Sequence, residues 1–191
     1  LTPQARVPRR AEKFGHRRLF RNLSHQFIFR GDIPILAPRL ATAIGRSISR
    51  RMQICELDLR GWTVATECAN SAYATTAAAA VAAGAEVWAF GRDSPWATFA
   101  ESAKDVIMLS EILGARTDRL NLVQQKADIP FERVDLVTNS GHLRPLDAPI
   151  ITRLPSNAII ALMFEAWEIR SGDIDLQQAT NCGIPIVAVD E

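Results

Sequence analysis

Short apolar runs alternate with helix-forming segments from residue 61 onward, and this alternation restricts the possible fold more than any other feature. Runs such as EVWAF and NAIIALMF span five to eight residues and are rich in Val, Ile and aromatic side chains, which favours strands over the helices of a six-helix bundle. Strands that are apolar throughout and alternate with helices form a parallel sheet covered on both faces. The sequence therefore predicts an α/β fold with a doubly wound, mostly parallel six-stranded sheet in the order 3-2-1-4-5-6.

Turn and cap signals give the expected bounds of each element. Ser94 is the expected N-cap of the longest helix, with Pro95 at its first position and Gly114 at its end. The expected strands are 62–67, 86–90, 119–123, 134–139, 157–164 and 184–189, and the expected helices between them are 74–85, 94–115, 147–154 and 175–183.

Charge divides the chain into two parts. Residues 1–60 hold 13 Lys and Arg against 4 Asp and Glu, whereas residues 61–191 hold 9 against 17. We interpret residues 1–60 as a basic helical N-terminal arm, with helices over 14–29 and from Pro38 onward. The arm mixes arginines with Leu and Phe, so we expect it to pack on the acidic part or on a second copy of the chain in a homo-oligomer rather than to bind nucleic acid.

Composition narrows the class of protein. The longest apolar run is far shorter than the roughly 18 residues that span a membrane, and no apolar segment follows the N-terminal arginines as in a secretory signal. The three cysteines, Cys55, Cys68 and Cys182, lie far apart and form no C-x-x-C motif. They therefore favour neither a disulfide framework nor a metal site, and we expect a cytoplasmic protein.

The expected sheet places candidate ligand-binding residues in the loops that follow its strands, because ligands of doubly wound sheets bind at the carboxyl ends, where strand order reverses. These loops are ECANSAY (67–73), GRDS (91–94), NSGHLRP (139–145) and FEAWEIR (164–170). Glu67 is unusual at the centre of a sheet, and a buried carboxylate needs a partner or an open crevice. We therefore include it in the site.

Two segments resemble a known group of proteins. The stretch LDLRGWTVATECANSAYATTAAAAVAAGAEVWAFGRDS resembles the opening of the nicotinamide-binding domain of D-2-hydroxyacid dehydrogenases and adenosylhomocysteinases, and DLVTNSGHLRPLDAPIITRLPSNAIIALM resembles their stretch around the nicotinamide half. The resemblance covers roughly residues 57–191. It implies a Rossmann-like NAD(P)-binding domain over 61–191, belonging to an oxidoreductase of the hydroxyacid dehydrogenase type.

The first loop departs from that family. The G-x-G-x-x-G fingerprint lets backbone approach a pyrophosphate, but Cys68, Asn70 and Tyr73 stand at its glycine positions. Backbone amides at the helix start can still bind an anion, and Asn70 and Ser71 add polar side chains. The degenerate fingerprint keeps a second interpretation open, a non-catalytic Rossmann-like binding or assembly module for another nucleotide or a protein partner.

The second loop bears on the choice between NADP and NAD. An acid at the end of the second strand binds the ribose hydroxyls of NAD, and here Gly91 takes that position, followed by Arg92, Asp93 and Ser94. Arginine pairs well with a 2′-phosphate. We therefore place NADP ahead of NAD, while Asp93 leaves NAD open.

The fourth and fifth strands end in the candidate catalytic residues. Asn139 and Ser140 offer hydrogen-bonding groups, and Gly141 permits close approach. His142 is the only histidine of residues 61–191 and titrates near neutrality, which makes it the first choice for proton transfer. Glu165 follows the fifth apolar run and is the second candidate. The sequence alone leaves open whether the protein is an enzyme.

Overall fold

The structure is a computed structural model that describes residues 36–165 and 170–189. The chain forms two compact units, Leu1–Ile33 and Pro34–Glu191. The helix expected over 14–29 lies outside the described residues. The second unit contains the whole sheet, and also the helix that begins at Pro38, although the charge pattern divides the chain at residue 60.

The centre of the second unit is a six-stranded sheet in the order β3-β2-β1-β4-β5-β6, in which neighbouring strands run parallel. The doubly wound fold expected from the sequence is therefore confirmed, with the reversal of strand order between β1 and β4. The strands are β1 (Thr63–Glu67), β2 (Glu86–Phe90), β3 (Leu120–Val123), β4 (Leu136–Asn139), β5 (Ile159–Glu165) and β6 (Ile186–Val189).

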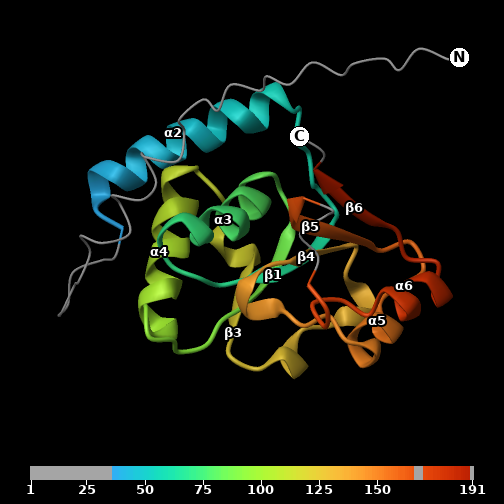
Figure 1. Ribbon diagram of the computed structural model, residues 1–191. Coiled ribbons are helices and arrows are strands. Elements are labelled where there is room, and N and C mark those ends of the chain that lie inside the picture. Colours follow the sequence, from blue (N-terminus) through green and yellow to red (C-terminus); the bar gives the residue numbers. More distant parts are fainter. Residues whose placement is uncertain (1–35, 166–169, 190–191) are drawn as a thin grey trace, which may run out of the picture. The chain divides into compact units, whose positions relative to one another are not determined.

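Helices lie on both sides of this sheet (Figure 1). Helices α2, α3 and α4 lie on one side, and α5 and α6 on the other. Two buried clusters match this arrangement, one built from α2, α3 and α4 with Val64 and Val87, the other from α5, α6 and β5 with Phe131. The helices are α2 (Pro38–Ile54), α3 (Ala74–Ala82), α4 (Phe99–Ile112), α5 (Ala148–Arg153) and α6 (Leu176–Asn181).

Alanine determines how α3 packs. Five of its nine residues are buried, and four of these are alanines, with Val81 the fifth. Small side chains on the buried face let the helix approach β1 and β2 closely, as glycine does in the dinucleotide fingerprint. The alanine-rich run thus supplies part of the close packing that the missing glycines would provide.

Helix α4 begins later than the sequence suggested. Its N-cap is Thr98, whose hydroxyl accepts from the amide of Glu101 at 3.2 Å, while the Glu101 carboxylate accepts from the Thr98 amide at 2.7 Å. This reciprocal capping box satisfies two helix-end amides at once. Ser94 instead closes a turn by accepting from the amides of Trp96 and Ala97. The expectation that Ser94 caps α4 is therefore wrong.

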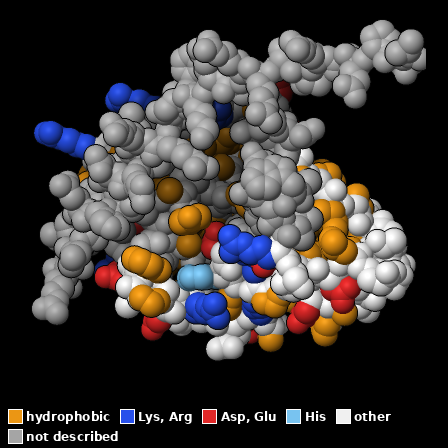
Figure 2. Space-filling view, in the orientation of Figure 1, with side chains coloured by type: hydrophobic (Ala, Val, Ile, Leu, Met, Phe, Trp, Pro, Cys, Tyr) orange, Lys and Arg blue, Asp and Glu red, His pale blue; other side chains and the backbone are white. Residues whose placement is uncertain are grey.

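Hydrophobic side chains also reach the surface. In Figure 2 they are mixed with charged side chains over the described part of the face shown. Along the described ranges, no helix combines the length and the apolarity that crossing a membrane requires.

Candidate functional site

A crevice of about 310 Å³ opens at the carboxyl ends of β1, β4 and β5, beside the start of α3. This is the point where strand order reverses, and ligands of doubly wound sheets bind there. Much of its wall comes from the loop after β4, and Glu67 comes from the end of β1. Among the described residues, the lining is Glu67, Ala72, Tyr73, Thr75, Thr76, Asn139, Ser140, Gly141, Arg144, Met163 and Arg170.

Glu67 fixes the loop that follows β4. Its side chain is only 4% exposed, and its carboxylate accepts a hydrogen bond from the backbone amide of His142 at 2.9 Å. A Cβ atom on Gly141 would collide with this carboxylate. Glycine at position 141 is therefore what lets the loop approach β1 closely enough to satisfy the buried acid.

A chain of hydroxyls underlies the crevice. Thr66 and Thr138, on neighbouring strands β1 and β4, have their hydroxyls 2.7 Å apart, and the Thr138 hydroxyl also lies 3.1 Å from the Ser140 hydroxyl. All three residues are buried. These contacts connect the ends of β1 and β4 to Ser140, which lines the crevice.

Asn139 differs from these satisfied neighbours. Its side chain is fully buried and lines the crevice, yet neither the amide nitrogen nor the amide oxygen has a hydrogen-bond partner among the described residues. An unsatisfied buried polar group typically costs about 1–3 kcal/mol. A side chain that keeps an unpaired donor and an unpaired acceptor in a crevice is suited to a ligand that supplies both.

The loop after β1 uses its polar groups within the protein. Ser71 adopts a positive φ of 55°, and its amide donates to the buried carboxylate of Asp105 on α4 at 2.9 Å. Cys68 is fully buried. Burial, reinforced by Glu67 and Asp105, raises the pKa of its thiol to about 12, so Cys68 is an unreactive core residue.

Aromatic, thioether and basic side chains surround the mouth of the crevice. Tyr73 and Met163 are 66% and 48% exposed. Arg144 forms an ion pair with Asp173 at 3.2 Å, and Arg170 lies in the same lining. The crevice thus combines a polar floor with an apolar and cationic mouth.

The edge beyond β2 carries a second group of charges. A Cβ atom on Gly91 would lie 2.6 Å from the backbone oxygen of Cys68, so no side chain fits at that position. Asp93 accepts from the amide of Phe99 at 2.8 Å and thereby supports the start of α4. No acidic side chain therefore fits at position 91. The carboxylate of Asp93 is already hydrogen-bonded within the protein, so it is not open to a ribose.

Two basic side chains, Lys126 and Arg92, lie near this edge. Lys126, in the loop after β3, donates to the backbone oxygen of Pro145 at 3.2 Å and lies over the Phe90 ring at 5.7 Å. Burial lowers the pKa of its ammonium; Asp147 opposes this shift and Arg92 adds to it. Arg92, which is exposed, therefore lies within electrostatic range of Lys126.

Of the two candidate catalytic residues, His142 is not among the described residues that line the crevice. The amide of His142 binds Glu67, but its side chain lies outside the residues that line the crevice, and its Nδ1 atom is buried with no partner among the described residues. Glu165 ends β5, and its side chain lies outside the described residues. A role in proton transfer stays a prediction for both.

The crevice brings together some of the predicted site residues and leaves others apart. Glu67, Asn139, Ser140 and Gly141 line it. Asn70, Ser71, Arg92, Asp93 and Ser94 do not, because they lie in the loop turned toward α4 or at the β2 edge. Sequence reasoning missed Asp105 and Lys126, because they contact the loops after β1 and β4 from a helix and a loop far away in sequence.

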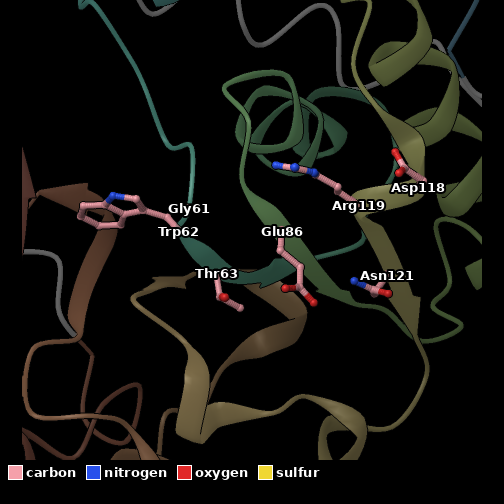
Figure 3. A pocket seen from close by; sticks show the side chains of 7 residues that line it. All are labelled: Gly61, Trp62, Thr63, Glu86, Asp118, Arg119 and Asn121. Carbon is pink, nitrogen blue, oxygen red and sulfur yellow. The ribbon is translucent and has the colours of Figure 1, made fainter.

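A separate hollow of about 350 Å³ lies at the amino ends of β1, β2 and β3. Figure 3 shows Glu86 and Asn121 reaching toward the same space, while the Trp62 ring extends away from them. Two of its polar side chains already have partners, since Asn121 donates to the Val87 oxygen and Arg119 to the Gly84 oxygen. We therefore take the crevice at the carboxyl ends as the candidate site. Within the described ranges, no three His, Cys, Asp or Glu side chains are grouped so that they could hold a metal ion.

Comparison with known proteins finds similar proteins by structure alone. No protein-family model matches the sequence, and no curated protein matches it significantly. Among solved structures, a dipicolinate synthase chain from Bacillus subtilis is 19% identical with a TM-score of 0.50, over 82% of this chain and 46% of that one. This similarity supports the Rossmann-type fold.

Two further structures give comparable values. The corresponding dipicolinate synthase chain from Bacillus halodurans is 21% identical with a TM-score of 0.47, over 84% of this chain and 48% of that one. Shikimate 5-dehydrogenase from Listeria monocytogenes, solved with shikimate and NAD, is 15% identical with a TM-score of 0.48, over 75% and 51% of the two chains. The present chain spans about half the length of these proteins.

Proposed function

We propose that the crevice binds a nicotinamide dinucleotide and that the chain is the NAD(P)-binding domain of an oxidoreductase. The observation that carries this proposal is Asn139, a fully buried amide with an unpaired donor and an unpaired acceptor, among the described residues, at the switch point of the sheet. A bound ligand would satisfy both groups. The cofactor supplies hydride transfer, and the protein supplies binding and orientation.

The residues present fit the nicotinamide half of such a cofactor. The volume of about 310 Å³ suits part of a dinucleotide rather than the whole molecule. Asn139 and Ser140 offer hydrogen bonds from the floor, and Tyr73 and Met163 offer apolar surface at the mouth. Amides at the start of α3, including that of Ala72 in the lining, are suited to the pyrophosphate.

The β2 edge favours NADP over NAD. The ribose diol of NAD needs an acid at the end of β2, whereas the backbone oxygen of Cys68 leaves no room for a side chain at Gly91. Arg92 and Lys126 concentrate positive charge at the same edge. A 2′-phosphate would bind between two such cations through charge-assisted hydrogen bonds.

The proposal also assigns an acid–base residue for the reaction. In this proposal His142 is the acid–base group, since its loop borders the crevice and an imidazole can both donate and accept a proton. The chain spans about half the length of the similar structures. The fold therefore does not establish the substrate or the overall activity, and both belong to the proposal. A homo-oligomer likewise stays a prediction.

A thermal-shift titration tests the proposal, using NADP, NAD, S-adenosylmethionine and ATP as ligands. A ligand that binds only the folded state raises the melting temperature. We expect NADP to give the largest shift, NAD a smaller one and the other two none. The Arg92→Ala variant should lose the larger shift with NADP than with NAD. The control variant Arg116→Ala should keep it, because the Arg116 side chain pairs with Asp118 directly before β3.

One observation favours a second candidate function. The Ser71 amide, in the loop after β1, donates a hydrogen bond to Asp105 within the protein. This favours a non-catalytic binding module for a ligand without a pyrophosphate. A shift with S-adenosylmethionine but none with NADP would support this candidate.

A further inference from the structure

Glu67 places a carboxylate in the wall of the crevice. It ends β1, and its side chain is only 4% exposed. Among the described residues, it is the only acid that lines the crevice. A carboxylate in such a place disfavours a negatively charged ligand group beside it and favours a positively charged one.

The sheet brings Glu67 close to the unsatisfied amide of Asn139. Strands β1 and β4 are paired so that Ala65 lies next to Val137, and Glu67 and Asn139 each follow two positions later. Side chains two positions apart on a strand point to the same face, and neighbouring strands lie about 4.8 Å apart. The two side chains therefore start side by side, and both line the crevice.

The loop after β4 orients the carboxylate. The Oε2 atom of Glu67 accepts a hydrogen bond from the backbone amide of His142 at 2.9 Å. Gly141 leaves room for this contact, because a Cβ atom there would collide with the carboxylate. The hydrogen bond thus joins the carboxylate to the loop that directly follows Asn139, so a ligand bound by Asn139 shares the crevice with this acid.

A nicotinamide group has the chemistry that these two side chains match. Its carboxamide offers a donor and an acceptor, which suit the amide of Asn139, unpaired among the described residues. The ring beside this carboxamide is positively charged in the oxidised cofactor and neutral in the reduced one. Charge near the ring is one of the means by which a protein tunes such a cofactor, so a carboxylate there acts differently on the two forms.

We propose that Glu67 makes the crevice prefer the oxidised, cationic nicotinamide ring to the reduced, neutral one. Asn139 binds the carboxamide and thereby places the ring near the end of β1, where the carboxylate attracts its positive charge. This inference rests on the proposed function, since the ring is that of NADP. It gives Glu67 a role in distinguishing the two forms of the cofactor and none in proton transfer.

Isothermal titration of the full chain with NADP, and separately with NADPH, tests this preference through the ratio of the two dissociation constants. Glu67→Gln keeps the shape and an acceptor for the His142 amide but removes the charge. The ratio should move toward NADPH by at least about tenfold, the lower end of the effect that one nearby opposite charge has on a charged form relative to a neutral one. Arg144 and Arg170, which also line the crevice, are present in every variant, so a changed ratio isolates the charge of Glu67.

Two control variants separate the charge from the shape of the crevice wall. Glu67→Asp keeps the carboxylate and should keep most of the preference for NADP, even where a shorter side chain weakens the binding of both forms. Glu111→Gln removes an exposed acid from α4 and should leave the ratio unchanged.

The outcomes separate this inference from the proposed function. An unchanged ratio in Glu67→Gln overturns the role of Glu67 and leaves the dinucleotide proposal standing. If the natural chain binds neither NADP nor NADPH, the dinucleotide proposal is overturned, and this inference with it. If Glu67→Gln does not fold, the natural chain decides, and tighter binding of NADPH than of NADP contradicts the preference.

Discussion

Individual residues of the crevice differ in how far their polar groups are hydrogen-bonded. Thr66, Thr138 and Ser140 satisfy one another beneath the crevice, yet Asn139 between them keeps both polar groups unpaired among the described residues. The sequence could mark Asn139 as a candidate because it ends an apolar strand. It could not reveal the missing partners, which depend on what the neighbouring strands bring within hydrogen-bonding distance.

Asn139→Ala tests the role of this unpaired amide. The variant removes two unsatisfied groups, so we expect an unchanged or higher melting temperature together with about tenfold weaker binding of NADP, the loss typical of a hydrogen-bonded contact. Thermal unfolding and isothermal titration measure the two effects. Asn121→Ala is the matched control, because the Asn121 amide donates to the Val87 oxygen and lies in the separate hollow. This variant should have a lower melting temperature and an unchanged affinity for NADP.

Gly141→Ala tests the close approach between Glu67 and the loop after β4. The added Cβ would collide with the Glu67 carboxylate, and overpacking of this kind typically costs about 1–3 kcal/mol in the free energy of unfolding. Glu67→Ala removes the colliding group, so the double variant should be less destabilised than the sum of the single variants. Additive effects in chemical denaturation would show that the two residues are not in contact.

At the level of elements, the sequence predicted what depends on local pattern and missed what depends on distant contacts. Residues 86–90 form a strand as expected, because an apolar run between Gly84 and Gly91 has few alternatives. Ser94 does not cap α4, because the capping box of Thr98 and Glu101 forms the helix start, while the Ser94 hydroxyl closes the preceding turn. Asp105 escaped prediction because its partner Ser71 is 34 residues away.

Thr98→Ala tests where α4 begins. Loss of an N-cap threonine typically costs about 1 kcal/mol, whereas Ser94→Ala should cost less, because Ser94 closes only a turn. Hydrogen bonds from Thr98 lower the pKa of the Glu101 carboxyl. A carboxyl with a lowered pKa contributes stability above its ordinary pKa, and this contribution is lost as pH falls through the lowered value. The loss of unfolding free energy caused by Thr98→Ala should therefore become smaller in acid. Equal effects of the two variants in urea unfolding would contradict the assignment.

At the level of the whole molecule, fold and ligand follow from different features. Parallel strands with helices on both sides determine a doubly wound sheet, and that sheet determines where a ligand can bind. The identity of the ligand depends on a few side chains and amides, among them Asn139, Gly91 and Ser71. For this reason the Rossmann-type fold could be predicted from the sequence, while the crevice needed the structure.

The most direct test of the central claim is a fluorescence titration of the chain with NADPH. Binding in the crevice at the carboxyl ends should give a saturable increase in NADPH emission that added NADP reverses. NAD should reverse it at least about tenfold less effectively, as expected for the loss of one charge-assisted contact. A response that stays linear up to millimolar NADPH, or one that NADP does not reverse, would contradict the assignment of this crevice as a nicotinamide dinucleotide site.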